Sequence, residues 1–277
     1  MIPSNNICMS LWKTILAYDG TPFHGWQIQT SLPTVQGTLA QAIQHVTGEL
    51  VLPQGAGRTD AGVHAHGQVA SFSIEAPIPA ANLHRALNRA LPASIRILSL
   101  EPAPPGFHAR HSAVAKTYEY RIFPARLHPL SLEHQEMPRI CSPMLAPFVW
   151  DNHLRLYLDA LQKAANHMIG THDFTSFAAS DPDLNSRDAS SPDSSQATNI
   201  RTIHSSSWSL RDGLLVYTVN GNGFLHHMVR NLVGTFVEAG CGRMPPDSLP
   251  AILQARDRAA AGPTAPARGL FLMEVIY

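Results

Sequence analysis

The nine residues from Gly57 to Ala65 combine two glycines with an arginine, an aspartate and a histidine. Arg58 and Asp60 are two residues apart, so they face the same way on extended backbone. The glycines permit a positive φ or a close approach of the backbone to a ligand. The pattern favours a carboxylate nucleophile or base beside a cation that touches the substrate. A surface turn with a local ion pair accounts for the pattern equally well.

Histidines near this stretch allow a second hypothesis. Asp60, His64 and His66 could ligate zinc or iron, since imidazole and carboxylate groups suit both metals. His226 and His227 could complete such a set. The chain has 15 histidines, however, so chance proximity favours the opposite interpretation. We therefore expect no metal and no cofactor, and keep a metal-dependent hydrolase as a rival function.

A second cation, Arg230, lies in an expected helix over 224–238 whose paired apolar residues leave only a narrow polar strip. A cation beside a buried face usually needs a carboxylate partner, and Asp60 is the candidate. The alternative is a side chain that extends to solvent along its apolar stem.

Tyr118 follows Lys116 on an expected strand over 115–123. An aromatic residue there is commonly part of the core, but its flat ring could also support a nucleic-acid base. Four basic side chains near the middle of the chain could contact phosphate: His108, Arg110, Lys116 and Arg121.

The composition of the 277 residues is that of an ordinary globular protein, with 44% hydrophobic residues and a formal net charge of zero. The zero charge gives no hint of a nucleic-acid partner. No apolar run is long enough to span a membrane, and the first twelve residues do not resemble a signal peptide. Cys8, Cys141 and Cys241 are too far apart to indicate a disulfide framework or a zinc site. We expect a cytoplasmic protein.

Hydrophobic periodicity predicts two similar halves. The first has strands at 14–18, 50–52, 68–75 and 95–98 and helices at 34–47 and 80–91. A stiff proline-rich connector at 102–106 predicts domains at 1–112 and 113–277.

The second half has strands at 115–123, 202–210, 214–219 and 270–277, and helices at 152–168, 224–238 and 248–258. An acidic, serine-rich stretch at 180–199 predicts a flexible loop. The second half repeats the β-α-β-β-α-β order of the first, with a loop and an extra helix inserted. This order predicts an α+β fold with two ferredoxin-like halves, whose antiparallel or mixed sheets flank a central active-site cleft.

Taken together, these motifs resemble the TruA-type tRNA pseudouridine synthases. The matching stretches lie at 18–20, 25–27, 35–36, 57–64, 67–69, 107–110, 173–177, 224–231 and 269–272, with the pair Tyr118 and Tyr120. The combination at 57–64 is highly specific, and the others follow in the family's order.

The resemblance implies isomerisation of uridine to pseudouridine in the anticodon arm of tRNA, at positions 38, 39 and 40. It implies Asp60 as the nucleophile and leaves open whether the sugar or the base is attacked. It also implies a homodimer that binds one tRNA across both subunits, without a cofactor. An acidic loop at 180–199 would repel RNA, so we expect it at the periphery.

The resemblance also assigns supporting roles. Arg230 keeps Asp60 ionised, and Arg58 supports the flipped uridine. Tyr118 stacks on the flipped base and could help to remove the C5 proton, and Leu270 belongs to the apolar wall of the pocket. A non-catalytic RNA-binding module remains the other rival, although such a module has no need of a poised carboxylate.

Overall fold

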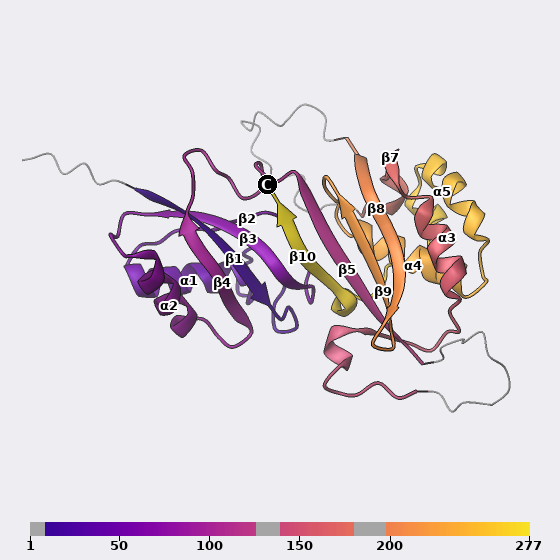
Figure 1. The fold of residues 1–277 in the computed structure, drawn as a ribbon, viewed down its shortest axis with the longest axis horizontal. Helices are drawn as coiled ribbons and strands as arrows, with labels where there is room; N and C mark the ends of the chain where they lie inside the picture. The colour runs from indigo at the N-terminus through magenta and orange to yellow at the C-terminus, as the bar shows by residue number, and fades with distance from the viewer. Residues whose placement is uncertain (1–8, 126–138, 180–197) are drawn as a thin grey trace, which may run out of the picture. The chain divides into compact units, whose positions relative to one another are not determined.

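The computed structural model describes residues 9–125, 139–179 and 198–277, and its chain divides into two units (Figure 1). The N-terminal unit comprises Met1–Val114 together with Phe271–Tyr277, and the C-terminal unit comprises Ala115–Leu270. The closing strand, expected in the second domain, therefore belongs largely to the N-terminal unit. Most of the expected acidic loop, at 180–197, lies outside the described residues.

The N-terminal unit has the expected β-α-β-β-α-β order, closed by the last strand of the chain. Its elements are β1 (Ser10–Tyr18), α1 (Val35–Thr47), β2 (Gln54–Gly55), β3 (His64–Ile74), α2 (Ala80–Ala90), β4 (Ile95–Pro102) and β10 (Leu270–Ile276). The strand order is β4-β1-β3-β10. β1 is antiparallel to both β3 and β4, whereas β10 is parallel to β3, so the sheet is mixed.

The second strand, expected to open at 50–52 and to run into the glycine stretch, starts later than expected. Leu50 and Leu52 are 81% and 46% exposed, so their apolar side chains do not mark a buried strand. The strand β2 comes after them and pairs only with Ser71 and Ala70 of β3. β3 itself begins at His64, four residues earlier than expected, and His64 pairs with β10.

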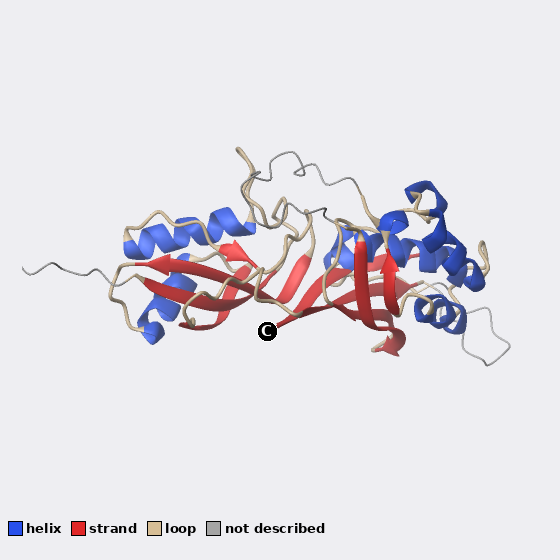
Figure 2. Cartoon of the chain, turned by 90° about the horizontal axis from the view of Figure 1, so that it is seen from above, coloured by secondary structure: helices blue, strands red, loops and turns tan. Residues whose placement is uncertain are grey.

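The two helices of the N-terminal unit supply its core. The Thr34 hydroxyl caps α1 by accepting a hydrogen bond from the Gly37 N–H at 3.2 Å, and α1 ends at Gly48, where φ is 79°. Leu39 of α1 and Leu83 of α2 are fully buried. Figure 2 shows both helices beside the strands of this unit.

The C-terminal unit has its own set of strands and helices. Its elements are β5 (Ala115–Pro124), β6 (Trp150–Asn152), α3 (Leu158–Asn166), β7 (Gly170–Asp173), β8 (Ile200–Arg211), β9 (Leu214–Gly221), α4 (Met228–Gly240) and α5 (Leu249–Ala255). The strand order is β5-β9-β8-β7, with neighbouring strands antiparallel. The predicted hairpin is confirmed: Asp212 and Gly213 connect β8 to β9 with φ angles of 51° and 74°.

The helix expected over 152–168 is too long by six residues at its start. Asn152 instead ends β6, which pairs with β5, and its side-chain oxygen accepts a hydrogen bond from the Leu154 N–H at 2.8 Å. This local turn delays the helix until Leu158. Leucine spacing alone does not reveal such a turn.

The other two helices of this unit also differ from the expected ranges. α4 begins at Met228 rather than at 224, because His227 has a left-handed φ of 58°. α5 ends at Ala255, since Arg256 has a left-handed φ of 51°. The α+β class and the mixed sheet are nevertheless confirmed. Among the described residues, every helix is too short or too polar to cross a membrane.

Candidate active site

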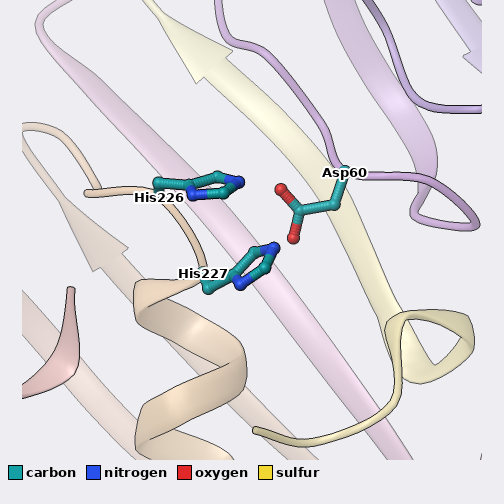
Figure 3. Close-up of side chains that lie close together, drawn as sticks. All are labelled: Asp60, His226 and His227. Carbon is teal, nitrogen blue, oxygen red and sulfur yellow. The ribbon is translucent and has the colours of Figure 1, made fainter. Parts of the chain in front are cut away.

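Asp60 lies half-buried on the loop that leads into β3 (Figure 3). The preceding residue, Thr59, is buried and held at two atoms. Its carbonyl accepts the Trp26 N–H at 3.0 Å, and its hydroxyl lies 2.8 Å from the Tyr18 hydroxyl. The backbone that carries Asp60 is therefore fixed by β1 and by the loop that follows it.

A buried side-chain network extends this support. The Gln68 amide donates to the Gly57 carbonyl at 2.8 Å and reaches the Tyr18 hydroxyl at 3.5 Å. Burial raises the pKa of Tyr18 to about 12, against the opposing effect of its hydrogen bonds to Thr59 and Gln68. Tyr18 therefore keeps its proton at neutral pH. Its hydroxyl contacts Thr59 directly and reaches Gly57 through the Gln68 amide.

Two glycines allow the loop after β1 to approach the Asp60 loop at backbone distance. A Cβ atom on Gly20 would lie 2.0 Å from the Val63 carbonyl oxygen, and one on Gly25 would lie 2.6 Å from that of Thr59. Gly25 also has a φ of 88°, which side chains disfavour. The sequence motifs around these glycines thus serve to position the Asp60 loop.

Tyr18→Phe should lower kcat about tenfold, because losing a buried hydrogen bond of about 1–1.5 kcal/mol loosens the loop that carries Asp60. Tyr217→Phe is the matched control, since the Tyr217 hydroxyl is also buried and lies 2.8 Å from the Ser206 hydroxyl. Steady-state kinetics and thermal unfolding of both variants provide the check. A similar fall in kcat for both would show a loss of folding only.

His64 supports the same loop. Its buried ring stacks on Phe271 at 4.7 Å, and its Nδ1 accepts the Gly20 N–H at 3.0 Å. Asp19 Oδ1 lies 3.2 Å from the same nitrogen. A backbone N–H always donates, so Nδ1 is the acceptor and the Asp19 contact adds no hydrogen bond.

His66 is exposed and also stacks on Phe271. Within the described part of the chain, Asp60, His64 and His66 do not gather their ligand atoms as a metal site requires.

The predicted phosphate contacts of the N-terminal unit lie in one tight turn. His108 Nδ1 accepts hydrogen bonds from the N–H groups of Arg110 and His111 at 3.1 and 3.3 Å. Burial lowers the pKa of His108, and the nearby positive charges of His111 and Arg110 lower it further. A neutral His108 organises the turn, whereas Arg110 is exposed and permanently charged.

Tyr118 is buried on β5 of the C-terminal unit. Phe224 packs edge-on against its ring, with centroids 5.0 Å apart and planes at 77°. This contact fixes the plane of the ring, as a stacking platform requires. Lys116 is two residues earlier on the same strand and therefore on the same face.

Arg230 is the third residue of α4, and only Arg230 and Glu238 of that helix are not buried. Its Nε donates to the Ala265 carbonyl at 2.8 Å, and the Ala265 N–H donates to the Arg230 carbonyl at 3.1 Å. The narrow polar strip predicted for this helix is confirmed.

Tyr120 contacts the segment before β10. Its hydroxyl donates to the Pro266 carbonyl at 2.7 Å. Burial raises the pKa of Tyr120, while the charges of Arg230 and Arg268 act in the opposite direction. The next residues bring Leu270 into the core, where it is buried.

His226 and His227 lie directly before α4 (Figure 3). Their ring centroids are 3.9 Å apart. The His226 carbonyl accepts the Ala179 N–H at 3.0 Å, and the His227 carbonyl accepts the Asn231 N–H at 2.9 Å. Their main chain thus fixes the start of the helix.

The predicted site residues fall in both units. Arg58, Asp60, His108 and Arg110 lie in the N-terminal unit, and Lys116, Tyr118, Arg230 and Leu270 lie in the C-terminal unit. Sequence reasoning missed the supporting roles of Tyr18, Gln68 and Phe224, although each lies in or beside a quoted motif. The signal that could have found Tyr18 and Gln68 is a polar side chain inside an otherwise buried element.

Comparisons with known proteins show what this chain is similar to. The family model described as tRNA pseudouridine synthase matches residues 15–112 and 164–277. These ranges include Asp60 and Arg230, whereas Tyr118 falls between them.

Three relatives are all described as tRNA pseudouridine synthase A. That of Solibacter usitatus is 47% identical over 266 residues, covering 96% of this chain and 98% of the relative. That of Moorella thermoacetica is 42% identical over 273 residues, covering 97% of this chain and 100% of the relative. That of Acetivibrio thermocellus is 40% identical over 265 residues, covering 96% of this chain and 98% of the relative.

Proposed function

Because this chain belongs to the tRNA pseudouridine synthase family, we propose that it isomerises uridine in the anticodon arm of tRNA, at positions 38, 39 and 40. Asp60 is the proposed nucleophile. The observation that carries this assignment is the loop of Asp60, which is held on both sides by buried hydrogen bonds while the carboxylate itself stays half-buried. A nucleophile must be held in this way to meet a reacting atom.

The proposed reaction adds and removes no atoms. The bond from C1′ to N1 of uridine breaks, the base turns, and C1′ joins C5, whose proton is lost as N1 gains one. An ionised Asp60 attacks either the sugar or the base. The positive charge of Arg230 favours the ionised carboxylate, and its tether to Ala265 supports this role.

The target uridine must leave its stack, which costs a few kcal/mol. The flipped base stacks on Tyr118, and the fixed plane of the Tyr118 ring supports this role. Leu270 contributes an apolar wall. Arg58 supports the flipped state and is exposed on the loop of Asp60. Arg110 and Lys116 contact tRNA phosphates, with His108 organising the turn of Arg110.

We further propose that the enzyme acts as a cytoplasmic homodimer. A formal net charge of zero gives a single chain little attraction for RNA. Two subunits that share one tRNA can place local basic residues, such as Arg110, along a common surface. Sedimentation of the protein with and without tRNA tests this assembly.

One experiment separates the proposed function from its two rivals. The protein is incubated with unmodified tRNA in the presence of EDTA, and pseudouridine is then mapped along the tRNA. We expect pseudouridine at positions 38 to 40. A metal-dependent hydrolase would lose its activity with the chelator, and a non-catalytic RNA-binding module would form no pseudouridine under any condition.

A further inference from the structure

A buried polar cluster around Asn231 anchors the segment 258–265 to α4. Asn231 is fully buried, and its side-chain amide donates to the Phe177 carbonyl at 2.8 Å. Its side-chain oxygen accepts a hydrogen bond from the Thr264 hydroxyl at 2.6 Å and from Arg258 Nη2 at 3.1 Å. Both ends of this amide are thus satisfied without water, which fixes its orientation.

The main chain of the same segment lies directly against α4. A Cβ atom on Gly234 would lie 1.6 Å from the Pro263 carbonyl oxygen, so only glycine allows this approach. The Gly262 N–H donates to the Thr235 hydroxyl at 2.9 Å. The segment can therefore occupy only one position along the helix, with Thr264 beside Asn231.

This anchoring reaches Arg230 through the next residue. Ala265 follows Thr264, and its carbonyl holds Arg230 Nε at 2.8 Å. An arginine side chain has many rotamers, so the place of its guanidinium depends on such a tether. The place of the Ala265 carbonyl depends in turn on the hydrogen bond between Thr264 and Asn231.

We propose that Asn231 and Thr264 are positioning residues, which set the guanidinium of Arg230 for the reaction. The inference rests on the proposed function, in which Arg230 supports the ionised nucleophile. Neither residue needs to touch the substrate. Removing their hydrogen bond should slow turnover more than it weakens tRNA binding or the fold.

Thr264→Val tests this link, because it removes the hydroxyl and keeps the shape of a side chain that is exposed at the surface. We expect kcat to fall about 5- to 20-fold with KM unchanged, as for the loss of one part-buried hydrogen bond to the buried Asn231 side chain. Thr264→Ser restores the hydroxyl and should restore kcat. Thr202→Val is the matched control, since its hydroxyl lies 2.8 Å from that of Thr171 in the same unit.

A second experiment makes Thr264→Val in the Arg230→Lys variant. A lysine at this position keeps the positive charge and loses the Nε donor. There, Thr264→Val should change kcat by less than about twofold, because residues that act through one group are not additive. Equal effects of Thr264→Val in both backgrounds, or an effect no larger than that of Thr202→Val, would overturn the inference. The proposed function fails separately, if Asp60→Asn retains turnover.

Discussion

Asp60→Asn should abolish pseudouridine formation while leaving tRNA binding intact. The amide keeps the shape of the carboxylate but cannot attack carbon, so kcat should fall about 10⁴-fold or more, as when other nucleophiles are removed. Affinity for tRNA depends mainly on phosphate contacts and should change by less than about threefold. Single-turnover assays on unmodified tRNA and filter binding at fixed salt measure the two quantities.

The control for this variant is Asp159→Asn, which changes an exposed carboxylate in the first turn of α3. It should turn over tRNA at the wild-type rate. Turnover by purified Asp60→Asn above the level of a mock preparation would contradict the assignment of the nucleophile. Lost activity accompanied by a large fall in melting temperature would instead show that Asp60 supports the fold.

The element order could be predicted because each strand and helix carries its own local pattern. α1 shows this most clearly, since its apolar spacing, its Thr34 cap and its Gly48 stop agree with one another. Asp60 could be singled out for a similar reason, because its motif is continuous in sequence. The residues that hold the Asp60 loop could not be predicted in this way. Tyr18 reaches Thr59 across 41 residues, and this contact depends on the pairing of β1 with β3.

The wrong helix boundaries also have a physical cause. Apolar spacing continues through Leu154 and Phe224, but side-chain caps and left-handed residues interrupt the backbone there. The turn at Asn152 and the φ of 58° at His227 are single-residue features, and non-glycine residues seldom have a positive φ. A window of ten or more residues averages such features away.

Arg230→Ala should lower kcat by about 10³-fold, which corresponds to about 4 kcal/mol of lost charge stabilisation. The expected loss is large because the guanidinium sits on a helix that is otherwise buried, where water screens charge poorly. Arg230→Lys should recover part of the rate, since it restores the charge without the planar fork. Pseudouridine formation over a range of pH measures both variants.

Arg243→Ala is the matched control, because Arg243 is exposed near the other end of α4 and contacts Glu238 at 3.1 Å. Exposed ion pairs contribute about 0–1 kcal/mol, so this variant should keep the wild-type rate and nearly the wild-type stability. Equal rates for Arg230→Ala and Arg243→Ala would show that no catalytic charge resides at Arg230. A rate for Arg230→Lys equal to that of Arg230→Ala would mean that the tether to Ala265, and not the charge alone, is what the reaction requires.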